Sequence, residues 1–323
     1  MSALLEVRDL SVSFRVGRGR LQALDAVSLS LARGETLGLV GESGSGKSTF
    51  ARALMLGLRP DAGDILFDGA PVSRLAGAAL KAFRRRMQMV FQDPYSSLDP
   101  RMSVARILAE PLAAHGIGTR AERARLVADL LAKVGLPEDA ALRLPSQFSG
   151  GQRQRVAIAR ALALSPEVLI ADEPVSALDV SIQAQIVNLL RDLKEERGIA
   201  LLVIAHDLAL VHQLSDRIAV LYLGRVVEEG PADALVAAPL HPYTAALLSA
   251  SPQPDPRAAS RRIVLKGEPP SALDRPRGCA FHPRCPIARP LCAETTPPLA
   301  EAAQGRRVAC FFPGELPGPL AGS

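Results

Sequence analysis

The sequence TLGLVGESGSGKST, residues 36–49, decides the fold of this chain. Its second half, from Gly41 to Ser48, fits the pattern G-x-x-x-x-G-K-[ST] without departure. The preceding run at 37–40 is typical of a buried strand, while residues 48–58 have a helical period. Glycines in such a turn let the backbone wrap closely around phosphate oxygens, and the N-terminus of the next helix faces the anion. The stretch therefore predicts a phosphate-binding turn between a strand and a helix.

Individual side chains of this turn have distinct expected roles. Lys47 would place its positive charge between the β- and γ-phosphates of a nucleotide, and the Ser48 hydroxyl would be a ligand of Mg²⁺. The alternative is a glycine-rich turn that ends in lysine and serine by chance. The residues expected to bind the nucleotide are Gly41, Ser43, Gly44, Gly46, Lys47, Ser48 and Thr49.

A second apolar run, VLIADEP at residues 168–174, ends in two carboxylates. A buried strand would carry Asp172 to the Mg²⁺ ion, and Glu173 would lie at the carboxyl end of the strand, where parallel sheets bind their ligands. A carboxylate in that place can orient and deprotonate an attacking water. The alternative is a pair of solvated acids at a strand end.

Two more polar residues follow apolar runs. Gln92 comes after residues 89–91, and its amide could reach Mg²⁺ or the attacking water without adding charge. His206 comes after residues 201–205, one strand beyond Glu173, and we expect it to contact the γ-phosphate. Each has an ordinary alternative, because a surface glutamine and a structural histidine are both common. The expected catalytic residues are Glu173, His206 and Gln92.

The composition bounds the remaining options. The 323 residues are 48% apolar, so the chain can bury a large core, but only 4% are aromatic and there is no Trp. This argues against a platform that stacks nucleic-acid bases, so no nucleic-acid partner is expected. The formal charge of +5 fits a nucleotide, an anionic membrane face or a plain solvated surface. No apolar stretch reaches the ~20 residues of a membrane span and no signal peptide is recognised. We therefore expect a cytoplasmic protein that other chains would hold at any membrane.

Hydrophobic periodicity predicts a mainly parallel α/β fold, because strands alternate with helices along the chain. The expected strands are short ones at 4–7, 27–31 and 36–40 and buried ones at 168–171 and 199–205, and the expected helices lie at 48–58, 103–135, 153–164 and 181–196.

The sequence SGGQ at residues 149–152 resembles the signature motif of ABC ATPases, usually written LSGGQ, with Phe148 in the first position. The run at 153–164 reads as a helix, so Ser149 would cap a helix N-terminus and the glycines would allow close approach to a phosphate. The resemblance implies that two subunits dimerise head to tail, and that the signature of each closes the ATP site of the other. The signature residues are Ser149, Gly150, Gly151 and Gln152.

The same resemblance assigns further residues. The run SALD at 176–179, which ends in Asp179, looks like the D-loop of the family, which communicates across the dimer. Phe14 occupies the place of the aromatic residue that stacks on adenine, although it could equally belong to the core. The motifs follow the family's order over residues 4–235, which implies an enzyme that binds Mg²⁺ and hydrolyses ATP.

The resemblance also implies a fold, that of P-loop NTPases. It has a RecA-like α/β core, an N-terminal antiparallel β subdomain and a helical subdomain at about residues 93–160. The ABC ATPase domain would cover residues 1–235 and a small C-terminal extension residues 236–323. A proline-rich linker at 251–256 and a disordered tail at 313–323 are expected as well.

The extension narrows the family. The runs HPYT at 241–244, KGEPPS at 266–271 and GCAFHPRC at 278–285 resemble the C-terminal extension of oligopeptide and dipeptide importer ATPases. The run QDPYSSLDP at 92–100 also resembles that group, in the form typical of its F-type rather than its D-type subunit. The implied function is to power the import of oligopeptides or dipeptides.

Such an importer implies partners. A second ABC ATPase subunit would complete a heterodimer, and two transmembrane permease subunits would hold the pair at the cytoplasmic face of the inner membrane. An extracytoplasmic substrate-binding protein would supply the peptide indirectly. Two other functions stay open: the ATPase of a nickel or other small-solute importer, and a soluble ABC ATPase of DNA repair or translation. The latter often carries two cassettes or long coiled-coil insertions.

Four cysteines, all after residue 278, follow the spacing C-x5-C-x6-C-x17-C. Disulfides are not expected in a reducing cytoplasm. Four thiolates can bind a [4Fe–4S] cluster or tetrahedral Zn²⁺, and some relatives in this branch resemble cluster-binding proteins at these positions. We favour a cluster with a structural role over zinc, and four unmetallated thiols are the alternative. The residues are Cys279, Cys285, Cys292 and Cys310.

Overall fold

The computed structural model describes residues 3–17, 19–176, 178–250, 263, 265, 267, 268, 270–302 and 305–316. The predicted linker at 251–256 lies outside the described residues, as do Ala177, Lys266, Pro269 and the last seven residues of the predicted tail. The chain forms two compact units, each described by itself below. The first contains Met1–Leu4, Leu31–Glu35 and Arg74–Val203, and the second contains Leu5–Ser30, Thr36–Ser73 and Ile204–Ser323.

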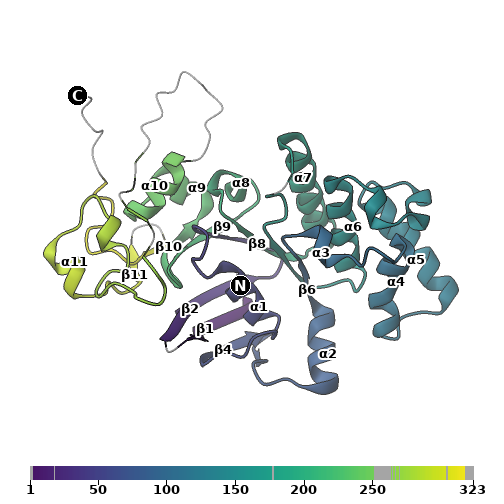
Figure 1. Cartoon of the computed structure of the whole chain (residues 1–323), viewed down its shortest axis with the longest axis horizontal. Helices are drawn as coiled ribbons and strands as arrows, with labels where there is room; N and C mark the ends of the chain where they lie inside the picture. The colour runs from purple at the N-terminus through teal and green to yellow at the C-terminus, as the bar shows by residue number, and fades with distance from the viewer. Residues whose placement is uncertain are drawn as a thin grey trace. The chain divides into compact units, whose positions relative to one another are not determined.

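The first unit combines two parallel strands with six of the α-helices in the described part of the chain (Figure 1). Strand β6 pairs with β7 in parallel, from Met87 opposite Val168 to Val90 opposite Ala171. Every residue of β7 is buried, as its continuous apolar sequence predicts. The elements of this unit are α2 (Gly77–Arg86), β6 (Met87–Val90), α3 (Pro94–Ser97), α4 (Val104–Ala114), α5 (Arg120–Lys133), the 3₁₀ turns η1 (Glu138–Leu142) and η2 (Pro145–Gln147), α6 (Gly150–Leu162), β7 (Val168–Asp172) and α7 (Val180–Arg197).

The single helix predicted at 103–135 is wrong in its continuity, because α4 and α5 are separate helices. Gly116 and Gly118 between them have φ values of 68° and 67°, which lie in the left-handed region. Thr119 then starts α5 with a capping box, in which its hydroxyl accepts from the Glu122 N–H and the Glu122 carboxylate accepts from the Thr119 N–H.

An antiparallel sheet forms one part of the second unit, with strand order β2-β1-β4-β5 (Figure 1). Its strands are β1 (Ala3–Val16), β2 (Gly19–Ala32), β4 (Ala62–Phe67) and β5 (Ala70–Pro71). The strands expected at 4–7 and 27–31 are therefore much longer than predicted. Asp9 has a φ of 47° and the pairing with β4 shifts its register between Arg8 and Ser11, so a bulge lets β1 continue where the pattern suggested a break.

The second unit also holds a sheet that contains the predicted strand at 36–40. Strand β3 (Thr36–Val40) runs parallel to β9 (Arg217–Tyr222), and β10 (Arg225–Pro231) pairs with β9 in the antiparallel sense. Two strands of the C-terminal region, β12 (Arg306–Val308) and β11 (Ala300–Ala302), extend this sheet beyond β10. The predicted boundary at 235/236 stays a prediction, but part of the region after it is hydrogen-bonded into the sheet that begins with β3.

Short helices complete the second unit. They are α1 (Lys47–Leu54), α8 (Leu208–His212), α9 (Ala232–Ala237), α10 (Pro242–Ala250), the 3₁₀ turn η3 (His282–Arg284) and α11 (Pro290–Glu294). The helix predicted at 48–58 ends earlier than expected, since Leu56 adopts a φ of 52° two residues after α1 stops. Strand β8 (Ala200–Ala205) spans the border between the two units.

A buried ion pair ties β12 to β10. The Glu228 carboxylate is fully buried and accepts from Arg306 Nη2 at 2.5 Å. It also accepts from the backbone N–H groups of Leu240 and His241, both at 2.9 Å. The carboxylate therefore holds β12 and the segment before α10 around one charge.

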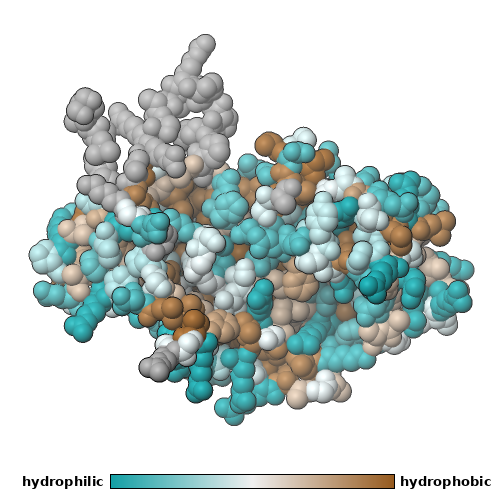
Figure 2. All heavy atoms as spheres, viewed as in Figure 1, coloured by the Kyte–Doolittle hydropathy of each residue, from teal (hydrophilic) through white to brown (hydrophobic). Residues whose placement is uncertain are grey.

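The surface carries hydrophilic and hydrophobic residues interspersed over the face that Figure 2 shows. Among the large apolar residues that the structure describes, the largest exposed fractions belong to Leu142, Val180, Tyr95 and Phe91, at 83%, 81%, 62% and 50%. Among the described residues, no helix has the length and apolar character that crossing a membrane requires.

Replacing Arg306 by methionine keeps the apolar stem but removes the cation from the buried Glu228 carboxylate. We expect the free energy of unfolding, measured by urea denaturation, to fall by about 3–5 kcal/mol. Arg307→Met is the matched control, because Arg307 is partly exposed and its partner Glu229 also pairs with Arg217. The control should cost about 1 kcal/mol or less. Equal losses in the two variants would contradict the role of the buried pair.

Candidate functional site

The turn after β3 accepts only glycine at two positions. A Cβ atom on Gly41 would lie 2.2 Å from the carbonyl oxygen of Leu221. Gly46 has a φ of 108°, and a Cβ there would lie 2.5 Å from the carbonyl oxygen of Ala23. Because any side chain would collide with backbone, the turn sits directly against the neighbouring strands. These contacts give a physical reason for two of the glycines in the motif.

Lys47 occupies the centre of this turn. Its side chain is buried, and Nζ donates to the carbonyl oxygens of Gly41 at 2.7 Å and Glu42 at 3.0 Å. The Ser45 hydroxyl is also buried and has no hydrogen-bond partner among the described residues. Ser43 and Gly44 are exposed at the tip, while Ser48 and Thr49 in the first turn of α1 are half-buried. The turn thus gathers an ammonium group, a hydroxyl and a helix N-terminus, which are groups that bind phosphate.

Two other predicted residues of the second unit lie near its surface. Phe14, on β1, is 37% exposed, so its ring is not part of the core. His206 is exposed and directly follows β8. The exposure removes the core alternative for Phe14, and the roles proposed for both residues stay predictions.

The first unit brings Gln92 and Glu173 together. Because Val90 pairs with Ala171 in the parallel register, the residues that follow β6 and β7 emerge at the same edge of the sheet. Gln92 Nε2 donates to Glu173 Oε2 at 2.8 Å, and Asp172 at the end of β7 is 4% exposed. The amide orients a carboxylate at the edge where parallel sheets bind ligands.

Glu173 has a strained backbone. Its φ of 45° lies in the left-handed region, which costs a non-glycine residue about 1–3 kcal/mol. The N–H and the hydroxyl of Ser176 both donate to its carbonyl oxygen, at 3.4 Å and 3.3 Å. Strain of this kind is common at functional sites, where it fixes the direction of a side chain.

Ser149 caps α6 as predicted. Its hydroxyl accepts from the Gln152 N–H at 3.3 Å, and the Gln152 side chain accepts from the Ser149 N–H at 3.1 Å. Phe148 is buried just before the cap, which explains how an aromatic residue can replace leucine in the motif. Ser149 itself is exposed, so the tip of α6 is open to a ligand outside the first unit.

The glycines of this cap pack against the start of α7. A Cβ on Gly150 would make an ordinary contact with Leu178 at 3.4 Å, but one on Gly151 would lie 2.4 Å from Ile182 Cγ2. Asp179 precedes α7, is exposed, and makes no side-chain capping bond among the described residues. Gly150 of the signature therefore lies beside Leu178 of the D-loop, although sequence analysis treated the two motifs separately. Ile182 was missed because nothing in either motif marks it.

All four cysteines line one small pocket, together with aromatic rings of Phe281, Phe311 and Phe312. Burial raises the pKa of Cys285 to about 11 and also raises the pKa values of Cys279 and Cys310. The thiols of Cys279, Cys285 and Cys310 are therefore protonated at neutral pH. Although they share a pocket, no group of three or more His, Cys, Asp or Glu side chains that could hold a metal ion exists in the part of the chain that the structure describes.

Two residues of the C-terminal region contact the phosphate-binding turn and were missed by sequence analysis. Arg284 forms an ion pair with Glu42 at 2.6 Å, and the Tyr243 hydroxyl accepts from the Glu42 N–H at 2.8 Å. Both residues lie inside runs that carried the family resemblance, but nothing in those runs indicates a contact with a residue about two hundred positions away.

Comparison with known protein families gives two matches. The family described as "ABC transporter" matches residues 24–176. The family described as "Oligopeptide/dipeptide transporter, C-terminal region" matches residues 227–292.

Individual relatives agree with these matches. The chain is 52% identical to the "Probable peptide ABC transporter ATP-binding protein y4tS" of Sinorhizobium fredii, over 95% of this chain and 89% of that protein. It is 50% identical to the "Oligopeptide transport ATP-binding protein AppF" of Bacillus subtilis, over 96% of this chain and 97% of that protein. Among solved structures, a dimeric ATP-binding cassette, MJ0796 bound to ADP and Pi, is similar with a TM-score of 0.65 and 32% identity, covering 71% of this chain and 98% of that one.

The two glycines of the cap give a matched pair of variants. Gly151→Ala forces a Cβ into Ile182, so we expect overpacking to lower the free energy of unfolding by about 1–3 kcal/mol. Gly150→Ala has room, and the helix preference of alanine over glycine should leave it neutral or stabilised by up to about 1 kcal/mol. Urea denaturation monitored by circular dichroism measures both. A Gly151→Ala variant as stable as Gly150→Ala would contradict this packing.

Proposed function

The chain belongs to the family of ABC transporter ATP-binding proteins, and from this membership we propose that it hydrolyses ATP to power the import of oligopeptides or dipeptides. One observation carries the peptide assignment. The match to the C-terminal region of oligopeptide/dipeptide transporters at 227–292 follows the ABC match at 24–176 in the same chain. The runs HPYT and GCAFHPRC both lie within residues 227–292.

The phosphate-binding turn holds the nucleotide in this proposal. Lys47 would exchange one of its carbonyl acceptors for a phosphate oxygen, while the N–H groups at the start of α1 face the same anion. The residues expected to hold Mg²⁺ are Ser48, Gln92 and Asp172, which supply the oxygen ligands that this ion prefers. The ion would neutralise the charge of the phosphates. Phe14, exposed on β1, would stack on adenine.

Glu173 is the proposed base for the attacking water. The Gln92 amide and the constrained backbone fix the direction of its carboxylate before any substrate binds. A base held in this way avoids the cost of ordering the side chain during the reaction. His206 would donate to the γ-phosphate and sense its loss.

A second subunit completes the proposed site. Ser149 and the glycine backbone of one subunit would contact the phosphates bound by the turn of the other, with the exposed tip of α6 as the contacting element. We propose a heterodimer in which this chain is the F-type subunit, supported by the run at 92–100 and by its similarity to AppF. Asp179 would act in the same interface.

The first unit contains a mechanical link from the hydrolysis residues to the tip of α6. The segment after Gln92 forms α3, whose end is held by Arg160 of α6 through a bond from Nη1 to the Ser97 carbonyl oxygen at 2.7 Å. Arg153, also on α6, lies over the Tyr95 ring with 4.0 Å between the guanidinium carbon and the ring centroid. Displacement of α6 would therefore move α3.

The exposed aromatic residues beside Gln92 suit a partner surface. Phe91 and Tyr95 are 50% and 62% exposed, so both rings are accessible to another protein, and exposed apolar side chains that lie together can mark a binding surface. We propose that this segment contacts the two permease subunits and thereby holds the chain at the cytoplasmic face of the inner membrane. A substrate-binding protein on the other side would supply the peptide.

The cysteine pocket is proposed to hold a [4Fe–4S] cluster, with Zn²⁺ as the alternative. Four thiols around one enclosed space provide the donor set that either group needs. The N–H of Phe312 also donates to the sulfur of Cys310 at 3.4 Å, which is a contact that stabilises a thiolate. Binding would release the thiol protons and would require the sulfurs to rearrange, because the described side chains form no ready ligand set.

Cys285→Ser tests the cluster. Protein purified without oxygen should contain iron and acid-labile sulfide and show broad visible absorbance, and the variant should lose most of all three because one ligand is missing. Zinc without iron in the wild type would support the alternative ion. Wild-type protein that contains neither metal would contradict both assignments.

Glu173→Gln and Lys47→Ala together test the ATPase mechanism. Glu173→Gln should bind ATP with unchanged affinity while turnover falls at least about 100-fold, because the base is lost but the turn is intact. Lys47→Ala should fail to bind, since the central cation is gone. Fluorescent-nucleotide titration and phosphate release measure the two properties separately. Normal hydrolysis by Glu173→Gln would assign the base to another residue.

A further inference from the structure

Glu42, the first variable residue of the phosphate-binding turn, is held by the C-terminal region. Arg284 Nη1 and Nη2 donate to its two carboxylate oxygens at 2.6 Å and 3.0 Å, so the guanidinium engages the carboxylate as a fork. Arg284 is almost fully buried, with a side chain 7% exposed, and Glu42 is 28% exposed. The Tyr243 hydroxyl accepts from the Glu42 N–H at 2.8 Å. Side chain and backbone of Glu42 are thus fixed from two sides.

The contacts of Arg284 and Tyr243 with Glu42, called the Glu42 clamp, also act on Lys47, because Lys47 bonds to the carbonyl oxygen of the same residue. The carbonyl oxygen of Glu42 accepts from Lys47 Nζ, while its carboxylate accepts from Arg284. A paired fork sets direction as well as distance, so Arg284 determines where the Glu42 backbone presents its carbonyl. Loosening the fork would therefore loosen the cradle around the ammonium group.

Arg284 lies close in sequence to residues that line the cysteine pocket, namely His282 and Cys285. It ends η3 and is followed directly by Cys285. Phe281, one turn earlier, lines the pocket and packs against Tyr222 and Tyr243 with ring centroids 5.2 Å and 5.4 Å apart. The segment 279–285 therefore has cysteines at both ends and the clamp on the phosphate-binding turn between them.

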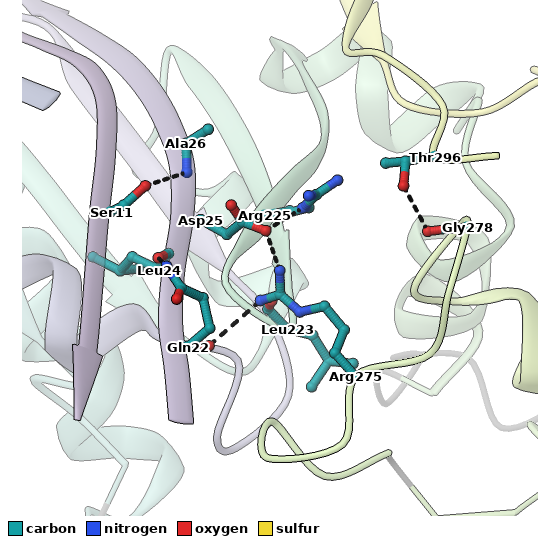
Figure 3. Close-up of polar contacts among 10 residues, drawn as sticks. All are labelled: Ser11, Gln22, Leu24, Asp25, Ala26, Leu223, Arg225, Arg275, Gly278 and Thr296. Carbon is teal, nitrogen blue, oxygen red and sulfur yellow. Dashed lines mark hydrogen bonds and ion pairs between the residues drawn. The ribbon is translucent and has the colours of Figure 1, made fainter. Parts of the chain in front are cut away.

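A second arginine of the C-terminal region holds a loop that bonds to the same turn. Arg275 binds the Asp25 carboxylate and the carbonyl oxygen of Leu223 (Figure 3). The next residue, Gly224, donates its N–H to the carbonyl oxygen of Ser45 at 2.7 Å. The turn is thus braced at Glu42 by Arg284 and at Ser45 by the loop that Arg275 holds.

We propose that Arg284 is a positioning residue for the phosphate-binding turn. Through Arg284, a change at the four cysteines of the pocket would alter the affinity of the turn for nucleotide. The inference rests on the proposed nucleotide site. It adds a role for Arg284, a residue that lies outside the turn and is not among the residues proposed to touch the nucleotide. Because coupling between two sites is reciprocal, a change at the cysteines alters nucleotide affinity, and bound nucleotide alters the reactivity of the cysteines by the same route.

Nucleotide titration tests the affinity side of the link. Arg284→Gln should weaken binding of MgADP about 5–50-fold, with a raised KM for ATP and little change in kcat, because the turn is misplaced but Glu173 is untouched. Arg284→Lys keeps the charge without the fork and should recover part of the affinity. Glu42→Gln alone should weaken binding, and combining it with Arg284→Gln should add little. Arg307→Gln, also in the C-terminal region, is the control and should bind as the wild type does.

Thiol alkylation tests the reciprocal side without relying on activity. The wild-type protein is first freed of any iron or zinc in the cysteine pocket. Saturating MgADP should then slow iodoacetamide labelling of its four cysteines, and the same addition should not slow labelling in Arg284→Gln. Circular dichroism and urea denaturation check that each variant is folded. If Arg284→Gln does not fold, the alkylation of the wild-type protein with and without MgADP decides whether the link exists, because it needs no variant.

The outcomes separate this inference from the proposed function. If wild-type protein does not bind MgADP, or Lys47→Ala binds it equally well, the nucleotide site itself is wrong. If binding depends on Lys47 but Arg284→Gln binds MgADP as the wild type does, the positioning role is overturned. Alkylation that MgADP leaves unchanged in the wild type overturns the link to the cysteine pocket.

Discussion

A buried ammonium group is the constraint on which the second unit depends. Lys47 is 5% exposed, so its charge must be matched by acceptors inside the protein. The carbonyl oxygens of Gly41 and Glu42 match it, and they can converge only because the turn presses against neighbouring backbone where a Cβ would collide. The buried strand β3 and its parallel partner β9 supply the rigid edge from which the turn starts.

The first unit depends on a different constraint, which is to fix the directions of two groups that are not buried, the Glu173 carboxylate and the Ser149 hydroxyl. Glu173 has a strained backbone, and its carboxylate accepts a hydrogen bond from the Gln92 amide. Both features fix the direction of the carboxylate. Ser149 is aimed by a capping box, and Gly151 lets α6 approach Ile182 closely. Arg153 and Arg160 then connect α6 to the segment after Gln92. The residues that motifs identify are therefore joined by residues that belong to no motif.

Sequence analysis predicted the features of this arrangement that depend on residues close together in the sequence. The strand before Gly41, the cap at Ser149 and the buried strand β7 were predicted correctly, because each depends on residues within one turn or strand. The break between α4 and α5 was also local: the spacing from Thr119 to Glu122 is a capping box, and it was missed in favour of a continuous pattern. What could not be predicted is contact between distant segments. Arg284 and Glu42 are 242 positions apart, and charge patterns do not select one pair among 38 basic and 33 acidic residues.

The same physics explains why an anion should be attracted to a turn whose lysine already has partners. The desolvation of Lys47 is a cost of folding that precedes any ligand, and two of its acceptors are neutral carbonyl oxygens. Hydrogen bonds to charged acceptors are roughly twice as strong as bonds between neutral groups. A phosphate oxygen that replaces a carbonyl oxygen therefore improves the pairing of a charge that is already out of water. The carbonyl oxygen that is not replaced still fixes the direction of the ammonium group, which makes the fixing of Glu42 part of the binding energetics and not merely of the fold.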